Sequence, residues 1–476
     1  MLDHKVRTTT NGNTVLSEKL IEEFTANLSG QLLCHGDEDY EEQRNVWNGM
    51  IDKHPALIVR CANVNDVVQA VNFARNNDLL VAVRGGGHNV AGTALCDDGL
   101  VIDLSLMKKV EVDPDARTAV AQGGATIADL DAATQPHGLA APMGVVSQTG
   151  IAGLTLGGGI GWLRRKYGLS SDNVLSFELV TADGRVLNVS KNEHPDLFWG
   201  LRGGGGNFGV VTAFEYQLHP VSPEVMFVFV LYHASKMQEV LRSYRDYCAT
   251  APDEVSSFMI AGNVPSSEDF PPEIHGEPFV LFGACYAGSV EEGQQVLQPL
   301  REFAEPMVDA SGPMPYTDVQ TILDAEFPDG FHYYWKSLYL DSLDDPVIDG
   351  VAACNEQRPS PLSTVDIWQM GGAISRFSED DSAVGSRDAP YLLGIEANWD
   401  PSEDDDANIA WARKCIADMQ PFSNGRQYLN FPGFLEDQEQ TMRTTFDNRY
   451  ERLVALKNKY DPTNFFRLNH NIKPSS

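Results

Sequence analysis

The sequence contains no long hydrophobic run. No apolar stretch among its 476 residues approaches the roughly 20 that a helix needs to cross a bilayer. The first residues, Met1 to Lys5, also lack the apolar core of a secretory signal peptide. We therefore expect a cytoplasmic protein that has no membrane partner.

The cysteines are few and unpaired in sequence. There are seven, and none forms a C-x-x-C pair. Zinc sites and redox-active dithiols commonly use such pairs, and a disulfide framework uses an even number of cysteines. The sequence therefore predicts neither a metal site nor a disulfide framework. Cys96, which lies close to a glycine-rich loop, is interpreted as a buried free thiol.

Positive charge is scarce. The chain has 35 lysines and arginines against 67 acidic residues, a formal net charge of −32, and only 13 of the cations are lysine. An anionic surface repels nucleic acid and acidic lipid, so we expect neither as a partner. This composition resembles that of halophilic proteins, and we expect stability to rise with salt as carboxylate repulsion is screened. It does not indicate an oligomeric state.

A run of glycines follows a predicted strand in the first quarter of the chain. A strand at 56–59, a helix from Asn65 as its cap to Asn77, and a strand at 79–83 predict a β-α-β unit. Arg84, three glycines, His88 and Asn89 come next. Consecutive glycines expose backbone N–H groups and let a phosphate approach closely. The loop is therefore a phosphate site with a histidine beside it or, alternatively, a turn with a surface histidine.

A second glycine-rich stretch spans residues 144–161, where seven of eighteen residues are glycine. Each interior glycine costs a helix or strand about 0.5–1 kcal/mol relative to alanine, so we expect irregular backbone packed against a flat ligand. Residues 204–209 match G-x-G-x-x-G, but a strand pattern at 210–218 follows instead of a helix. This order excludes a Rossmann dinucleotide site.

The middle of the chain has a different character. Predicted strands at 226–232, 278–287, 331–340, 364–374 and 391–399 alternate with helices at 235–248, 290–304 and 404–419. They indicate a second α+β domain on a largely antiparallel sheet. Its aromatic side chains are either core or pocket residues. After residue 425 we expect a strand and turn at 428–433 and one helix at 438–459.

Four features together resemble the FAD-linked oxidases of the vanillyl-alcohol oxidase and p-cresol methylhydroxylase (PCMH) superfamily, and within it the berberine-bridge-enzyme-like branch. They are the loop 84–88, the glycine stretch 144–161 with residues 166–169, the motif 207–212, and a tail with Tyr428-x-Asn430 and Asp461-Pro462-x-Asn464. The resemblance implies an α+β protein with a split PCMH-type FAD-binding domain, residues 1–220 and 425–476. The substrate domain, residues 221–424, is inserted between its two parts and built on the antiparallel sheet.

The resemblance also implies how FAD is held. The loop 84–89 would bind the pyrophosphate through backbone amides, and His88 matches the histidine that carries the flavin through its 8α-methyl group. Some relatives add a second bond through a cysteine, whose place here is taken by Val146, so a single attachment is expected. Thr149 falls where the family controls oxygen access. The expected cofactor-binding residues are Arg84, Gly85, Gly86, Gly87, His88, Asn89, Gly92, Gly144, Thr149, Gly150, Gly153, Gly157, Gly158, Asn207, Gly209, Val211, Tyr428, Asn430, Asn469 and Asn471.

The sequence does not identify a single catalytic base. Alcohol-oxidising relatives often carry a tyrosine where this chain has Phe431, which cannot take a proton. The base is then Tyr428 or another group such as Tyr334, Tyr339 or Glu396; or the substrate is an amine that needs no strong base; or activity is impaired. Lys336 would orient an anionic or phenolic substrate, or is a surface residue.

The predicted function is a flavoprotein oxidase. It would take hydride from a small alcohol, sugar, phenolic or amine substrate and reduce O2 to hydrogen peroxide. The alternatives are a dehydrogenase that uses another acceptor and a flavin- or ligand-binding protein without turnover.

Overall fold

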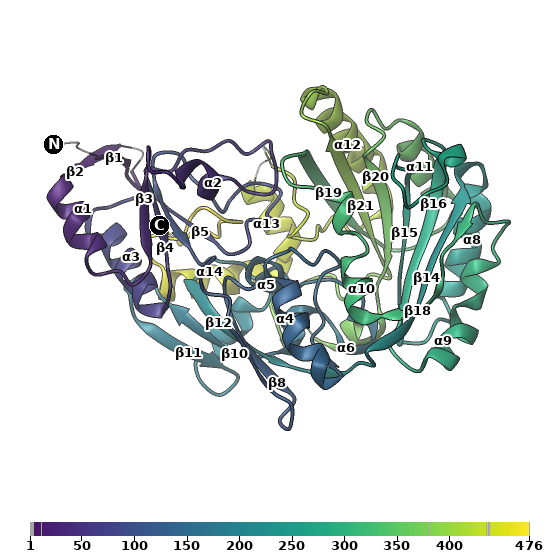
Figure 1. Cartoon of the computed structure of the whole chain (residues 1–476), viewed down its shortest axis with the longest axis horizontal. Helices are drawn as coiled ribbons and strands as arrows, with labels where there is room; N and C mark the ends of the chain where they lie inside the picture. Colours follow the sequence, from purple (N-terminus) through teal and green to yellow (C-terminus); the bar gives the residue numbers. More distant parts are fainter. Residues whose placement is uncertain (1–3, 11, 379, 435, 437, 476) are drawn as a thin grey trace.

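The computed structural model describes residues 4–10, 12–378, 380–434, 436 and 438–475. In Figure 1 the N-terminal elements lie at one end, the large sheet of the middle segment lies at the other, and the C-terminal helices lie between them, back against the N-terminal half. Within these residues no helix combines the length and the apolar character that crossing a membrane requires.

A small sheet carries the first glycine loop. Its order is β3 (Gln31–Cys34), β4 (Leu57–Arg60), β6 (Leu100–Asp103) and β5 (Val81–Arg84), with β4 and β5 both parallel to β6. The helix α3 (Val64–Asn76) joins β4 to β5 and confirms the β-α-β unit. The predicted cap was wrong, because Asn63 and not Asn65 accepts the hydrogen bond from Asp66 N. The remaining early elements are β1 (His4–Arg7), β2 (Asn13–Leu16), α1 (Glu18–Thr25) and α2 (Tyr40–Arg44).

A second sheet follows, in the order β11, β10, β12, β8, β7. Thr126 and Asp129 form a capping box at the start of the helix after β8. A short helix, Ile151–Leu156, lies inside the second glycine stretch, so the expectation that this stretch excludes a helix was wrong. The elements of this region are β7 (Val110–Asp113), β8 (Thr118–Gln122), α4 (Ile127–Thr134), β9 (Leu139–Ala140), α5 (Ile151–Leu156), α6 (Arg164–Tyr167), β10 (Val174–Val180), β11 (Val186–Ser190), α7 (Pro195–Leu201), β12 (Val210–Gln217) and β13 (His219–Pro220).

The middle segment forms an eight-stranded antiparallel sheet in the order β17, β14, β16, β15, β20, β21, β19, with β18 also paired to β14. Sequence patterns missed its central strand β15 and the helix α11. The elements are β14 (Glu224–His233), α8 (Met237–Cys248), β15 (Val255–Asn263), β16 (Pro278–Tyr286), α9 (Val290–Leu297), β17 (Val308–Asp309), β18 (Gly312–Pro315), α10 (Tyr316–Thr321), β19 (His332–Leu340), α11 (Asp345–Glu356), β20 (Thr364–Gln369), β21 (Tyr391–Trp399) and α12 (Asp405–Met419).

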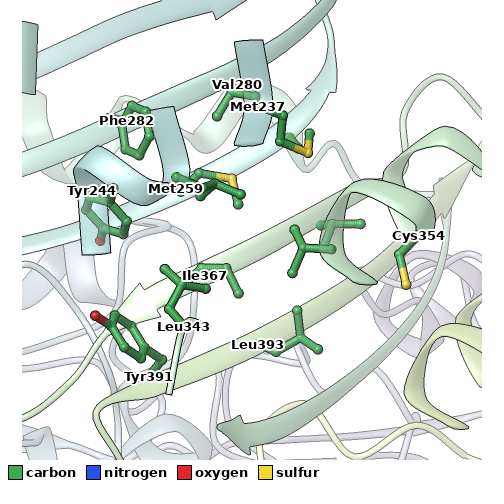
Figure 2. Close-up of a cluster of buried hydrophobic side chains, with 14 of the residues drawn as sticks. Met237, Tyr244, Met259, Val280, Phe282, Leu343, Cys354, Ile367, Tyr391 and Leu393 are labelled. Atoms are coloured by element: carbon green, nitrogen blue, oxygen red, sulfur yellow. The ribbon is translucent and has the colours of Figure 1, made fainter. Parts of the chain in front are cut away.

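Both faces of this sheet are buried. Helices α8, α9, α11 and α12 cover one face, and Figure 2 shows Met237 and Tyr244 of α8 packed beside Met259 and Phe282 of the sheet. The other face turns toward the N-terminal and C-terminal parts of the chain, where Trp368 and Leu392 share a core with Trp162 and Tyr428. Successive residues of a strand therefore point to two different interiors.

The C-terminal segment returns to the N-terminal half. The predicted single helix is interrupted at residues 447–449, so it forms α13 (Gln438–Phe446) and α14 (Tyr450–Tyr460). Residues 428–433 form turns rather than the predicted strand. Lys457 is fully buried and donates hydrogen bonds to Asn207 O and Phe466 O, at 2.8 Å each. The return thus shares a core with the N-terminal part, while the exact domain boundaries stay predictions.

Candidate active site

A cavity lies between the glycine-rich loops and the inner face of the large sheet. Its walls come from both glycine stretches, from the start of β12, from the C-terminal tail, and from β15, β19, β20 and β21. The cavity therefore runs from the phosphate-type loop to the middle segment. A long ligand in this cavity would meet the backbone of the glycine loops and side chains of the sheet.

The two glycine loops touch backbone to backbone. A Cβ atom on Gly86 would lie 2.5 Å from Gly150 N and 2.5 Å from Gly150 Cα. A Cβ atom on Gly150 would lie 2.4 Å from Gly86 N. Real Cβ atoms do not approach that closely, so only glycine permits this contact. The glycines that looked like a cofactor motif in the sequence thus also close the wall of the cavity.

Most of the predicted cofactor residues meet at this cavity. Those that line it are Gly85, Gly86, Gly87, His88, Asn89, Gly144, Thr149, Gly150, Gly153, Gly157, Gly209, Val211, Tyr428, Asn430 and Asn469. Asn469 donates to Gly206 O and Phe466 O, at 3.1 Å each, and its buried Oδ1 has no partner among the described residues. That oxygen is available to a ligand.

Five predicted cofactor residues do not line the cavity. Arg84 donates to the carbonyl of Gln43. Gly92 has a φ of +62° and forms part of a turn against Ile51. Asn207 is fully buried. Its Nδ2 donates to Gly204 O at 2.8 Å and His470 O at 3.0 Å, and its Oδ1 accepts from Ile472 N at 2.9 Å. Gly158 and Asn471 also lie outside the lining. These residues shape the walls rather than present polar groups to the interior.

His88 points its ring into an aromatic stack. It lies parallel to Trp47, with ring centroids 5.3 Å apart, and Trp47 stacks on Tyr333 at 3.8 Å. Trp47 is held by a 2.8 Å hydrogen bond from its Nε1 to Phe327 O. Burial lowers the pKa of His88 to about 4, so the imidazole is neutral at physiological pH. Sequence analysis missed Trp47, which lies in an acidic loop-like segment without a motif.

Val146 takes the position that the resemblance predicts for a second attachment of the flavin in some relatives. Val145 and Val146 both line the cavity. None of the seven cysteines, all within the described residues, belongs to the lining. Cys96 is 3% exposed, and burial raises the pKa of its thiol to about 12. The structure therefore offers no thiol to a ligand in the cavity.

Tyr428 lines the cavity with its hydroxyl already engaged. The oxygen accepts hydrogen bonds from Gly159 N at 3.2 Å and from Asn430 Nδ2 at 2.8 Å. Asn430 Nδ2 also donates to Leu154 O at 3.1 Å. Burial raises the pKa of Tyr428 to about 12. The hydroxyl therefore remains protonated at neutral pH and is a hydrogen-bonding group rather than a base.

Two other predicted bases lie outside the lining. Tyr334 points to the helix-covered face of the sheet, where its hydroxyl contacts Glu436. Lys336, two residues further along β19, points the same way and pairs with Glu436 at 3.4 Å. Neither side chain lines the cavity, because the alternation of β19 turns Tyr333 and Trp335 inward instead. Tyr339 lies on the inner face but borders a separate small pocket behind Tyr428, and burial raises its pKa above the usual range.

Glu396 lines the cavity together with a residue that sequence analysis missed, Asp366. Asp366 on β20 pairs with Gly394 on β21, so Asp366 and Glu396 project from the same face two positions apart. Each is 2% exposed. Asp366 Oδ1 and Glu396 Oε2 have no hydrogen-bond partner among the described residues. Two buried carboxyl groups therefore face the cavity side by side.

Burial and mutual repulsion raise the pKa of both carboxyl groups. Burial raises the pKa of Asp366 to about 7. Burial, and next the charge of Asp366, raises the pKa of Glu396 well above its usual range. Two close carboxyls cannot both ionise easily, so they share one proton around neutral pH. The signal for Asp366 was its position as the one charge in the apolar strand Thr364–Gln369.

The rest of this end of the cavity is apolar. Phe431 and Trp335 meet edge to face at 5.1 Å. The indole Nε1 of Trp368 is buried and has no acceptor within the described part of the chain. The apolar and aromatic side chains that residues 260–431 contribute to the cavity wall are Ile260, Leu323, Phe327, Trp335, Trp368, Leu392, Tyr428, Leu429 and Phe431.

Comparison with known proteins matches both ends of the chain to family models. A model described as FAD binding domain matches residues 55–190, and one described as berberine and berberine like matches residues 427–473. A FAD-linked oxidoreductase of Dictyostelium discoideum is 33% identical over 465 residues, covering 96% of this chain and 97% of that protein. The (R)-6-hydroxynicotine oxidase of Paenarthrobacter nicotinovorans is 29% identical, and the match covers 94% of this chain and 97% of that protein.

Solved structures agree. The crystal structure of 6-hydroxy-D-nicotine oxidase from Arthrobacter nicotinovorans superposes with a TM-score of 0.85 at 29% identity, over 94% of this chain and 98% of that one. Xylooligosaccharide oxidase from Myceliophthora thermophila has a TM-score of 0.84 at 22% identity, over 96% and 99%, and shares the fold. The resemblance and the fold class inferred from sequence are confirmed. This chain is an FAD-linked oxidoreductase of the vanillyl-alcohol oxidase and p-cresol methylhydroxylase superfamily, in its berberine-bridge-enzyme-like branch.

Proposed function

We propose that this protein is an oxidase that carries FAD covalently on His88, oxidises a small, largely apolar amine or alcohol, and passes the electrons to O2. The observation that carries the proposal is the cavity itself, whose wall combines a glycine cradle, a buried histidine and a carboxyl pair among apolar side chains.

The residues present are suited to FAD. The loop at Gly85–Gly87 offers backbone to a pyrophosphate without side chains in the way, and a Cβ atom on Gly153 would meet only open space in the cavity wall. The unpaired Oδ1 of Asn469 is a buried acceptor in the same wall. Backbone amides hold an anion without a cationic surface, which accounts for phosphate binding by a chain of net charge −32.

His88 is suited to a covalent bond. Its neutral imidazole has a free lone pair, because burial keeps the ring unprotonated. The stack on Trp47 fixes the plane of the ring. Since Val146 replaces the second attachment point, we expect one bond and no cysteinyl link. A bond to His88 would prevent dissociation of the cofactor.

The carboxyl pair is the proposed base. Bound FAD supplies the two-electron acceptor, and O2 takes the electrons on as hydrogen peroxide. Asp366 and Glu396, sharing one proton, accept the O–H or N–H proton of the substrate. The buried indole Nε1 of Trp368 donates to a substrate acceptor. Phe431 cannot accept a proton, and the carboxyl pair takes that role instead. Tyr428 is then not needed as the base.

The apolar walls favour an apolar substrate among the classes left open by the sequence. A sugar would bury several hydroxyl groups, and each one left unpaired costs about 1–3 kcal/mol. The cavity offers the carboxyl pair and one indole N–H amid aromatic and aliphatic side chains. An amine or hydroxyl group on an aromatic or aliphatic body suits this combination. Cytoplasmic location remains an expectation.

The test is a substrate panel of apolar amines, aromatic alcohols and sugars, followed by oxygen uptake and peroxide release. We expect turnover with the apolar amines or alcohols and one peroxide per oxygen consumed. Reduction of the flavin by substrate under nitrogen, without oxygen uptake in air, would instead indicate a dehydrogenase. A flavin that no substrate reduces would indicate a binding protein without turnover.

A further inference from the structure

A buried polar cluster joins the FAD-binding part of the chain to the substrate-binding part. Asp131 in α4 is 2% exposed, and Tyr316 and Gln320 in α10 are 1% exposed each. Gln320 Nε2 donates to Asp131 Oδ2 at 2.9 Å. Three further atoms, Asp131 Oδ1, Gln320 Oε1 and the Tyr316 hydroxyl, have no partner among the described residues.

Two of these unpaired atoms are acceptors when Asp131 is ionised. An unsatisfied buried acceptor is costly. The Tyr316 hydroxyl, the third unpaired group, bonds to neither of these oxygens, so the Asp131–Gln320 pair lacks one donor. A proton on Asp131 Oδ1 provides that donor and lets the carboxyl and the amide of Gln320 exchange two hydrogen bonds. In support, burial raises the pKa of Asp131 to about 7, which the hydrogen bond from Gln320 only partly offsets.

No charged group balances Asp131 from the surrounding elements that the structure describes. Tyr316 faces it, and burial and then the charge of Asp131 raise the pKa of that hydroxyl, so it stays neutral. Asp129 of the same helix is engaged in the Thr126 cap. The other ionisable side chains on the elements packed against α4 are all exposed: Glu111 and Asp113 of β7, His137 beyond α4 and Asp318 of α10.

The cluster holds a segment that forms part of the cavity wall. After α10 the chain continues through Leu323 and Phe327, which both line the cavity. Asp324 attaches this segment a second time to the FAD-binding part, because it accepts hydrogen bonds from Ser147 N at 2.8 Å and Ser147 Oγ at 2.5 Å. Residues 316–327 are thus a wall fastened at two points to the second glycine stretch and to α4.

We propose that Asp131 is a proton-dependent clasp: neutral Asp131 donates to Gln320 Oε1 and closes residues 316–327 over the cavity, and ionisation weakens that closure. The proposal is independent of the identity of the substrate. The direction of the pH dependence follows from the linkage between proton binding and folding. A carboxyl whose folded-state pKa is raised contributes stability that is complete below its ordinary pKa of 3.8 in the unfolded chain. That stability is lost as the pH rises to the folded-state pKa of about 7.

The informative variant is Asp131→Asn, because an asparagine amide supplies the missing donor at every pH. The matched control is Asp318→Asn, which changes an exposed carboxyl on α10, the helix that carries Gln320. The FAD-loaded protein is melted at intervals from about pH 5 to about pH 9. We expect the melting temperature of Asp131→Asn relative to wild type to rise from the acid end to near pH 7 and then level off. A difference that does not change with pH overturns the proposal.

Hydrogen exchange of the wild-type protein tests it without any variant. Peptides covering 316–327, corrected for intrinsic exchange, should lose protection several-fold between about pH 5 and about pH 8, while peptides of α3 stay unchanged. In Asp131→Asn the protection of 316–327 should be constant. Equal protection of this segment in wild type at both ends of the range contradicts the clasp, whatever the activity of the enzyme.

Discussion

The carboxyl pair gives the sharpest prediction about chemistry. Changing Asp366 and Glu396 together to Asn and Gln keeps the shape of the cavity but removes both proton acceptors. General-base catalysis contributes about 10²- to 10⁴-fold. At about 1.36 kcal/mol per factor of ten, the double variant should lose about 2.7–5.4 kcal/mol of transition-state stabilisation in kcat/KM.

The structure also predicts the pH dependence. Because the pKa of Asp366 is raised to about 7, wild-type kcat/KM should rise with pH through that region as the pair loses its first proton. This rising limb should vanish in the double variant. Flavin content and the visible spectrum should not change, because neither carboxyl belongs to the glycine cradle. The variant should also melt no lower at alkaline pH, since two buried groups that resist ionisation have become neutral amides.

The assay is steady-state oxygen uptake across pH, with the reductive half-reaction followed anaerobically. Glu356→Gln, an exposed carboxyl of α11 in the same part of the chain, is the control and should behave as wild type. A double variant with wild-type kcat/KM would refute the assignment of the base. So would a double variant that keeps the rising limb near pH 7, since another group would then be titrating.

Three further predictions concern stability and the cofactor loop. Gly86→Ala places a Cβ atom 2.5 Å from the backbone of Gly150, so it should lower the free energy of unfolding by about 1–3 kcal/mol and lower the flavin content. The control is Gly312→Ala, whose Cβ atom would have no atom within 4 Å. Equal melting temperatures of the two variants would contradict the contact. Lys457 and Asp461 form a fully buried ion pair at 2.8 Å. Lys457→Met leaves Asp461 without a counter-ion, so the free energy of unfolding measured in urea should fall by about 3–5 kcal/mol. A negligible change would show that the pair is dispensable. Raising KCl to molar levels should raise the melting temperature, because a net charge of −32 is screened; a falling value would exclude this.

Local patterns predicted the elements that carry the cofactor. The glycine loop after β5 follows from strand and turn chemistry alone, and the helix α3 between β4 and β5 from its apolar periodicity. The strand β15 was missed because its residues 255–262 are all buried. A strand buried on both faces shows no polar alternation to mark it.

The face on which a side chain lies was the main limit for the site. Tyr333, Tyr334 and Trp335 are all buried, yet only Trp335 lines the cavity, while Tyr334 points to the helix-covered face. Which ones do so depends on pairing between β19 and β21, a tertiary property. Asp366 becomes a candidate only when β20 and β21 are paired and bring it beside Glu396. Trp47 reaches His88 through contacts between segments far apart in sequence.

The most direct test of the account is the visible spectrum of the acid-precipitated protein, measured for wild type and His88→Ala. The account predicts a yellow wild-type pellet with a flavin band, one flavin per chain by intact mass, and a His88→Ala pellet that is colourless with the flavin in the supernatant. Flavin that stays in the His88→Ala pellet would contradict attachment through His88. A wild-type pellet without colour would contradict covalent binding altogether.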